Sequence, residues 1–334
     1  MAATVTDVTR PAVPSRGVPH RRGADLRRWR HRLTVLSFLT PALIGISVFL
    51  VYPLLSAIYF SFTRFDLLTA PQWVGLRNYE HLFTSDRTAW TAAANTLWLV
   101  VFLVPARMLA ALATAMLLTT VKRGGSVFRI IFYLPALAPP VAATIAFVFL
   151  FNPATGPVNE LLAVFGVDGP LWFDSPEWAK PSLVLLGTWA VGDLMVIFLA
   201  GLLDVPKPLY EAASIDGASS WQKFRFITLP SISPVLMFAG ITGVIQTLQF
   251  FTQAAVAASV ASGKATTGGG ISSTFGYPDQ ALLTYPLHLY VSGFRFYDMG
   301  YANALAVMLF LVAFAVTLVL LRRFRVFVAG GERG

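Results

Sequence analysis

Six long apolar runs constrain this chain more than any other feature of its sequence. Each run holds about 20 residues or more, which is the length that an α-helix needs to cross the hydrocarbon core of a bilayer. The runs lie near residues 35–60, 92–119, 128–151, 183–203, 233–253 and 300–321. The chain is 56% hydrophobic and only 12% charged, whereas soluble domains carry roughly twice that share of charge. The sequence therefore predicts an all-α, polytopic membrane protein with six transmembrane helices in one domain over residues 35–325.

Charged residues in the loops predict how these spans are oriented. Eight arginines crowd the first tenth of the chain, and further Lys and Arg residues stand after the second, fourth and sixth runs. The segment after the third run instead carries the acids Glu160, Asp168, Asp174 and Glu177. Because cytoplasmic loops are enriched in Lys and Arg, both termini are predicted to be cytoplasmic. Residues 1–34 are expected to be a basic, disordered tail near anionic lipid, with no nucleic-acid partner, and residues 326–334 a short C-terminal tail.

The residue inventory excludes several kinds of chemistry. The chain has no Cys and four His, so it holds neither a thiolate metal site nor a Cys nucleophile, and no two His stand at metal-ligand spacing on one predicted helix. A phosphate loop of the Walker type is also missing, because Gly124-Gly125 is not followed by Gly-Lys-Ser/Thr. We therefore expect no metal or cofactor in this chain and no ATP hydrolysis by the chain itself.

The stretch between the fourth and fifth runs, residues 204–232, predicts a helix–turn–helix projection. Pro208 suits the first turn of a short helix. Gly217 is typical of a tight turn, and Ser219 with Gln222 three residues later indicates a capping box that opens a second helix. Such a projection could dock a soluble partner. On local chemistry alone, an ordinary loop whose Gly and Pro residues end helices is an equally good interpretation.

The same stretch resembles the EAA signature of permeases from binding-protein-dependent ABC importers. The residues that match this signature, together with the acid beside its glycine, are Glu211, Ala212, Ala213, Asp216, Gly217, Ile227, Leu229 and Pro230. Residues 73–79 (WVGLRNY) and 294–306 (FRFYDMGYANALA) resemble further elements of sugar-importer permeases. One external element departs from the family, since Ile271 follows the Thr-Gly-Gly-Gly of residues 267–270 where Pro is usual.

The resemblance implies a type I ABC importer permease-like fold, similar to the maltose and glycerol-phosphate permease subunits, in the cell (inner) membrane. The chain would pair with a second, homologous permease and with two copies of an ABC ATPase, which bind ATP and Mg²⁺. An extracytoplasmic solute-binding protein would deliver a sugar outside, and the sugar would be released inward when the ATPases pull on the 204–232 loop. In this interpretation the chain is a transport subunit and has no catalytic residues of its own.

Two rival classes are an intramembrane enzyme and a passive channel. Ala190-Val191-Gly192-Asp193 resembles the GxGD site of membrane aspartyl proteases, but the first Gly is replaced and no second Asp occupies another predicted span. A mechanism that needs two carboxylates therefore lacks one of them. A passive channel would need rings of charge or of backbone carbonyls, and one Gly-rich external loop is weak support for either.

Arg107 and Asp193 are the ionisable residues near the middle of predicted spans. An unpaired charge at that depth costs about 2.5–3.5 kcal/mol even on insertion scales, so each side chain is expected to face the bundle interior and to find a partner. We predict that they pair with each other. The pair could line or close a transport route, or it could be a structural tie that fixes helix register.

Polar residues on the fifth apolar run form a candidate substrate stripe. Thr242, Gln246, Gln249 and Gln253 recur at four, three and four residues, with Phe250 beside them, and Asn303 at the start of the sixth run could complete the set. This spacing predicts one face of a single helix. Amides can exchange hydrogen bonds with sugar hydroxyls and an aromatic ring can cover a pyranose, so the stripe suits a neutral sugar. The alternative is that the amides bind neighbouring helices as packing contacts.

Overall fold

The computed structural model of the chain describes residues 21–121, 123–263 and 275–331, and of the side chains it leaves out those of residues 21–32 and 324–331. The described residues fall into two compact units, of which the first ends at Ser56 and the second begins at Ala57. Apart from one two-stranded hairpin, the regular structure of these described ranges is helical. The Thr-Gly-Gly-Gly element of residues 267–270 lies outside the described residues.

The first unit is helical from its first described residue. Helix α1 (Arg21–Ile46) continues through the π-helical turn η1 (Ser47–Val51) into α2 (Tyr52–Ser61). The expectation of a disordered tail over residues 1–34 was therefore wrong for residues 21–34, and the first 20 residues lie outside the described part. Residues 21–32 include six Arg, one Ala and one Leu, and all three residue types favour helix, so the helix of the apolar span extends toward the N-terminus.

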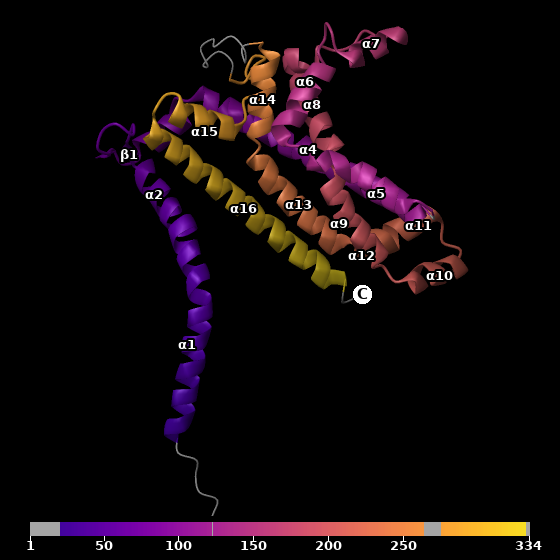
Figure 1. Ribbon diagram of the computed structural model, residues 1–334, viewed down its shortest axis with the longest axis horizontal. Helices are drawn as coiled ribbons and strands as arrows, with labels where there is room; N and C mark the ends of the chain where they lie inside the picture. Colours follow the sequence, from indigo (N-terminus) through magenta and orange to yellow (C-terminus); the bar gives the residue numbers. More distant parts are fainter. Residues whose placement is uncertain (1–20, 122, 264–274, 332–334) are drawn as a thin grey trace, which may run out of the picture. The chain divides into compact units, whose positions relative to one another are not determined.

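The second unit is built around the long helix α4 (Arg87–Thr120), against which α8, α9, α13 and α15 pack. Small and apolar side chains of α4 meet Met195 and Phe198 of α9 (Gly192–Leu203) in a fully buried cluster. The last helix, α16 (Met299–Gly331), runs beside α13 (Ser233–Leu248), as Figure 1 shows. The predicted C-terminal tail thus begins inside α16, whose helical backbone continues to Gly331.

Three helices are candidates for single spans, and three further pairs of helices are bent. Leu33–Ser61, Arg87–Thr120 and Met299–Arg323 are each long and apolar enough to cross a membrane. The bent pairs are Gly125–Leu137 with Pro140–Leu150 (95°), Pro176–Trp189 with Gly192–Leu203 (51°) and Ser220–Ser231 with Ser233–Leu248 (67°). If each pair is one crossing, the described residues hold up to six, as the apolar runs predicted. The sharpest bend contains Pro139-Pro140, and Pro cannot continue a helical hydrogen-bond ladder.

The first bent pair consists of α5 (Gly125–Tyr133), the 3-10 turn η2 (Leu134–Leu137) and α6 (Pro140–Leu150). The second consists of α8 (Pro176–Trp189) and α9. Gly192, the first residue of α9, lies against the backbone of α5. A Cβ at this position would stand 2.6 Å from the Phe132 carbonyl oxygen. Only glycine lets these two backbones approach so closely, and the contact holds the start of α9 beside α5.

The fifth apolar run departs from the prediction. It was expected to be one helix over residues 233–253, but α13 ends at Leu248 and α14 (Thr252–Ala261) begins after a break. The chain therefore turns at Gln249, Phe250 and Phe251, close to the end of the predicted span. Two consecutive aromatic residues, which are weaker helix formers than Leu or Ala, occupy the break.

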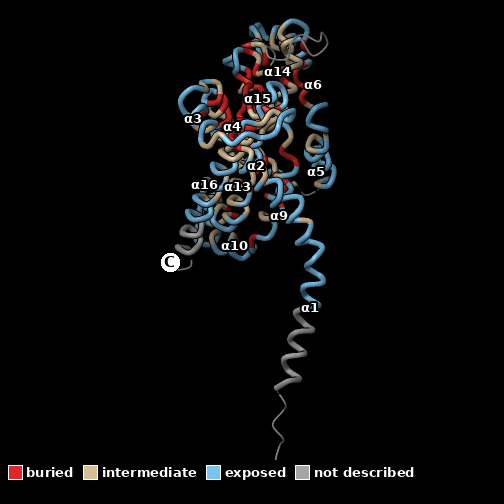
Figure 2. The backbone as a smooth tube through the Cα atoms, turned by 90° about the vertical axis from the view of Figure 1, so that its left-hand side faces the viewer, coloured by how far each residue is buried: buried red, intermediate tan, exposed pale blue. Residues whose placement is uncertain are grey.

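Short elements cover the end of the unit opposite the 204–232 loop. They are β1 (Thr63–Arg64), β2 (Gln72–Trp73), α3 (Arg77–Thr84), α7 (Pro157–Val164), η3 (Trp172–Asp174) and α15 (Tyr285–Phe294). Strands β1 and β2 pair antiparallel with Thr63 opposite Trp73, and the Asn78 amide donates to the carbonyl oxygens of Ser61 and Thr63. Figure 2 shows buried residues gathered around α4, α14 and α15. The 73–79 element therefore connects α3 to the hairpin and to the end of α2 through the hydrogen bonds of Asn78.

Candidate functional site

The 204–232 loop has the helix–turn–helix structure that its sequence predicted. Helix α10 (Lys207–Ile215) has Pro206 as its N-cap, and Gly217 takes a left-handed φ of 75° in the following turn. The Ser219 side chain accepts from the backbone N–H of Gln222, and the Gln222 side chain accepts from that of Ser219, which is the predicted capping box. Helix α11 (Ser220–Lys223), the π-helical turn η4 (Phe224–Thr228) and α12 (Leu229–Ser231) follow.

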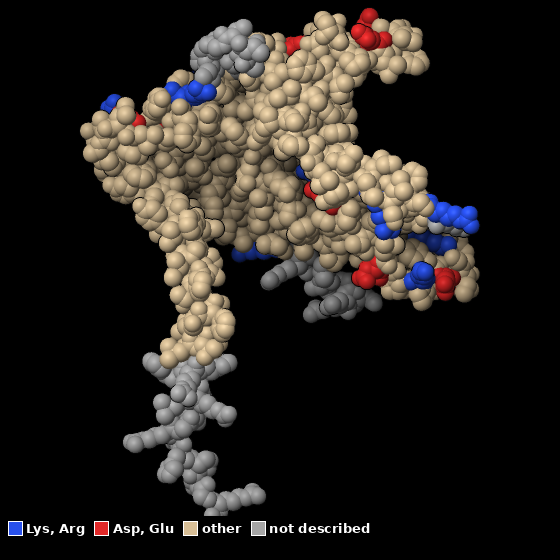
Figure 3. Space-filling view, viewed as in Figure 1, with Lys and Arg blue, Asp and Glu red and all other residues tan. Residues whose placement is uncertain are grey.

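One side of this loop packs against the helix bundle, and the other side is exposed. Tyr210, Phe224 and Ile227 pack against the buried cluster of α4 and α9, and the Tyr210 and Thr228 hydroxyls lie 2.9 Å apart. Glu211, Ala212, Asp216 and Gly217 are exposed, as are the large apolar side chains Leu209, Ile215, Trp221 and Phe226. Figures 1 and 3 show α10 at the edge of the unit with charged side chains around it. An exposed surface of mixed apolar and charged groups is the usual composition of a protein contact.

Most of the predicted substrate stripe lines one cavity of about 290 Å³, here called the amide cavity. Gln246 comes from α13, Gln249 and Phe250 from the break, and Gln253 from α14. The prediction that they share one continuous helix was wrong, because the break separates Gln253 from the others; the turn nevertheless directs all four side chains to the same cavity. None of the three glutamine side chains hydrogen-bonds to another residue that the structure describes.

The remaining stripe residues lie elsewhere. Thr242 lines a second cavity of about 160 Å³, here called the loop-side cavity, and its hydroxyl donates to the Phe238 and Ala239 carbonyl oxygens of its own helix. Asn303 lines neither cavity, and its amide donates to the Met299 carbonyl oxygen one turn back along α16. Asn303 thus does not complete the stripe.

Arg107 and Asp193 are brought together by α4 and α9. The Nη2 atom of Arg107 lies 3.4 Å from Oδ1 of Asp193, and their side chains are 22% and 54% exposed. Both residues line the amide cavity and also the loop-side cavity. Asp193 stands in the first turn of α9, where the positive end of the helix dipole favours a carboxylate.

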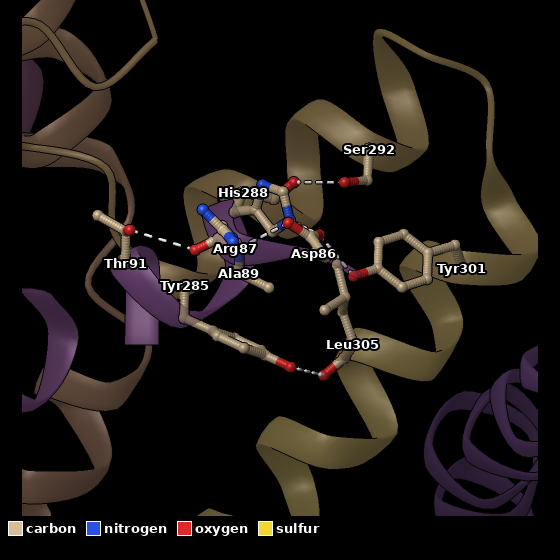
Figure 4. Close-up of polar contacts among 9 residues, drawn as sticks. All are labelled: Asp86, Arg87, Ala89, Thr91, Tyr285, His288, Ser292, Tyr301 and Leu305. Carbon is tan, nitrogen blue, oxygen red and sulfur yellow. Dashed lines mark hydrogen bonds and ion pairs between the residues drawn. The ribbon is translucent and has the colours of Figure 1, made fainter. Parts of the chain in front are cut away.

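The sequence did not predict a second polar site, which lies at the N-terminal end of α4. Asp86 caps α4 by accepting from the Ala89 backbone N–H, and its other oxygen lies 2.8 Å from His288 Nε2 and 2.6 Å from the Tyr301 hydroxyl (Figure 4). Burial raises the pKa of the Asp86 carboxyl, but the hydrogen bonds from Tyr301, Ala89 and His288 outweigh it and hold this pKa below its ordinary value. The site ties α15 and α16 to α4. Only the capping position of Asp86 could have signalled it.

A third polar contact involves Lys180 of α8. Its ammonium group donates to Asn95 Oδ1 at 2.9 Å and stands 5.5 Å from the Trp98 ring centroid. The Asn95 amide in turn donates to the Gln280 and Leu283 carbonyl oxygens. This network joins α8, α4 and the segment before α15. Among the described residues, no group of three or more His, Asp or Glu is arranged to hold a metal ion.

Comparison with known proteins decides the family. Residues 107–327 match the family described as binding-protein-dependent transport system inner membrane component. The chain belongs to that family. The permease is 35% identical over 295 residues to the probable ABC transporter permease protein YesP of Bacillus subtilis, covering 88% of this chain and 91% of that protein. It is also 35% identical over 264 residues to the lactose transport system permease protein LacF of Rhizobium radiobacter, covering 78% and 83%.

A solved structure shows the same fold. A bacterial ABC transporter involved in the import of alginate aligns with a TM-score of 0.73 over 92% of this permease and 99% of that chain, at 23% identity. Membership of this family makes the permease a multi-pass inner-membrane component of an ABC transporter, and a transport subunit rather than an enzyme. Family membership also favours this interpretation over the intramembrane protease and the passive channel.

Proposed function

We propose that this permease carries a sugar or sugar-like solute inward and that the solute contacts the chain in the amide cavity. The observation that supports this most directly is that Gln246, Gln249 and Gln253 meet there without a hydrogen-bond partner in the described chain. Amides used only for packing would be bonded to neighbouring helices. Unpaired amides beside Phe250 offer donors and acceptors to hydroxyl groups together with an aromatic face.

The relatives support the same class of solute. One is named for lactose transport and another, the permease SmoG of Agrobacterium fabrum, for sulfoquinovosyl glycerol; the latter is 31% identical over 310 residues. Both names describe glycosides with several hydroxyl groups. The cavity, of about 290 Å³, is at the small end of the range for ligand pockets. A second permease subunit that faced this cavity would enlarge it.

The energy for transport comes from other subunits. We assign the exposed face of the 204–232 loop to an ABC ATPase, which binds ATP and Mg²⁺, because this face combines Glu211 with exposed Leu209, Ile215 and Trp221. Two ATPase copies, a second homologous permease and an extracytoplasmic solute-binding protein complete the importer. Both termini and the loop then lie in the cytoplasm, as the charge distribution predicts.

The test is uptake of a panel of labelled neutral sugars and sugar acids by the complete importer in proteoliposomes. Gln246→Leu and Gln249→Leu should each raise the half-saturation concentration about 2- to 10-fold, which corresponds to one lost hydrogen bond of about 0.5–1.5 kcal/mol. The matched control is Gln72→Leu, which makes the same change on an exposed strand outside both cavities. Unchanged kinetics in both cavity variants, with normal assembly, would contradict the proposal.

A further inference from the structure

The Arg107–Asp193 pair stands at the boundary between two cavities. The amide cavity and the loop-side cavity share four lining residues, Arg107, Asp193, Gln246 and Thr247. Beyond these, the amide cavity is lined by residues around the breaks of the bent helices, and the loop-side cavity by residues nearer the 204–232 loop, such as Met108, Ile197 and Phe238. A solute that passes from the first cavity toward the loop therefore meets this boundary.

The geometry of the pair is that of a contact that can open. The two groups share one contact, of 3.4 Å, whereas an Arg and a carboxylate in good geometry form two bonds of about 2.7–2.9 Å. The Nε atom of Arg107 is buried and has no hydrogen-bond partner among the described residues. More than half of the Asp193 side chain is exposed. The guanidinium is thus held by one weak contact, and the carboxylate is open to competing donors.

The Asp86 site of the same protein is an example of a buried polar contact that holds helices together. There, one carboxylate accepts at 2.6, 2.8 and 2.9 Å from three groups on three helices. The Asp86 and His288 side chains are each only 10% exposed. The contrast favours the movable interpretation for Arg107 and Asp193 over the structural one.

From these observations we infer that the Arg107–Asp193 pair is a movable partition, closing the way between the amide cavity and the loop-side cavity until a solute separates the two charges. A polyhydroxylated solute suits this role, because its hydroxyl groups can donate to the Asp193 carboxylate and accept from the Arg107 guanidinium. The inference rests on the proposed function in one respect, that the amide cavity is where the solute enters.

The experiment measures access to the loop-side cavity without needing to know the solute. The native chain has no Cys, so a single Cys can be introduced without removing others. Gln253→Cys reports on the amide cavity and Thr242→Cys on the loop-side cavity. The complete importer, in vesicles of one orientation, is treated from each side in turn with a membrane-impermeant quaternary-ammonium methanethiosulfonate. Remaining thiols are then counted by a mass shift of this chain alone, so Cys residues of partner subunits do not interfere.

With the native pair, Thr242→Cys should react more slowly than Gln253→Cys from the side on which Gln253→Cys is reactive. Adding Arg107→Gln with Asp193→Asn should raise the Thr242→Cys rate from that side about fivefold, equivalent to about 1 kcal/mol of lost closure. The double change leaves the net charge the same, so altered attraction of the cationic reagent does not explain a faster rate. The Gln253→Cys rate should not change.

A Thr242→Cys rate that is equal with and without the pair would overturn the partition. If the double variant does not assemble, Asp193→Asn alone decides, since it changes one atom of the side chain and should still accelerate labelling; no acceleration would again overturn the inference. The labelling experiment tests the partition and the uptake experiment tests the proposed solute class, so either proposal can be refuted without the other. A normal labelling result with no uptake of any sugar in the panel would contradict the proposed solute class and leave the partition standing.

Discussion

Replacing Asp86 by Ala should be the most damaging single change at the end of the bundle opposite the 204–232 loop. The change removes an acceptor that serves the His288 ring, the Tyr301 hydroxyl and the Ala89 backbone N–H. Both side chains of the His288–Asp86 pair are 10% exposed, so water does not replace the lost partner readily. Removing one member of a buried, hydrogen-bonded pair typically costs about 3–5 kcal/mol.

A second variant measures one part of the free-energy cost of Asp86→Ala. Tyr301→Phe removes one hydrogen bond to a charged group and leaves the carboxylate bonded to His288 and Ala89, so the expected loss is about 1.5–3 kcal/mol. The helix cap contributes about 1 kcal/mol of the total. These terms are not additive, because all three donors share one carboxylate.

The pH dependence of the Asp86 contribution has a definite sign. Burial raises the pKa of this carboxyl, but the hydrogen bonds from Tyr301, Ala89 and His288 outweigh burial, so the pKa in the folded chain lies below its ordinary value of 3.8. A depressed pKa means that the ionised group stabilises the folded state above the unfolded-state pKa and that this stabilisation is lost as the pH falls through the folded value. Protonation of Asp86 should therefore weaken the fold, and only below about pH 4.

The assay is thermal unfolding of the detergent-solubilised importer together with hydrogen exchange of α15. Asp86→Ala should lower the midpoint and accelerate exchange over residues 285–294. Asp168→Ala, an exposed acid in the loop after α7, is the control and should cost no more than about 0.5 kcal/mol. If Asp86→Ala were no more destabilising than this control, the reasoning from buried hydrogen bonds would be refuted.

Three further changes test backbone features. Gly217→Val forces a β-branched residue into a left-handed turn at about 1–2 kcal/mol, so ATPase pull-down should weaken while membrane insertion persists; normal pull-down would count against the coupling role. Ser219→Ala removes the capping box and should cost about 1 kcal/mol, seen as faster hydrogen exchange in α11, and unchanged exchange would contradict it. Gly192→Ala places a Cβ 2.6 Å from the Phe132 carbonyl oxygen and should cost about 1–3 kcal/mol in thermal unfolding, whereas Gly125→Ala, in open space, should not.

Features that depend on neighbouring residues were predictable from the sequence. The apolar runs identified the crossings, because a membrane helix must satisfy its backbone hydrogen bonds within one segment. The turn at Gly217 and the capping box at Ser219 follow from the chemistry of a few consecutive residues. The pairing of Arg107 with Asp193 could be anticipated for a different reason, since two opposite charges at mid-span depth have few other partners.

Features that depend on distant residues were not predictable in the same way. The contact of Asp86 with His288 spans 202 residues of sequence, and that with Tyr301 spans 215. No periodicity marks such a pair. The break after Leu248 was missed because the glutamine spacing fits a continuous helix equally well, and Phe250-Phe251 are apolar residues that occur in spans. The grouping of the three glutamines in one cavity therefore came from a turn that the pattern does not contain.

The two helices that flank the 204–232 loop connect it with the cavities. Helix α9 begins at Gly192, beside Asp193, and ends at Leu203, directly before the loop. Helix α13 begins at Ser233, after the loop, and extends about 24 Å at 1.5 Å per residue to Leu248, beside Gln249. The helices also pack on each other near the loop, where a Cβ at Gly201 would stand 3.0 Å from a Val235 methyl group. A displacement of the loop by an ATPase would thus move both helices together, and it would act on the Asp193 side of the partition and on the amides through the same rigid pair.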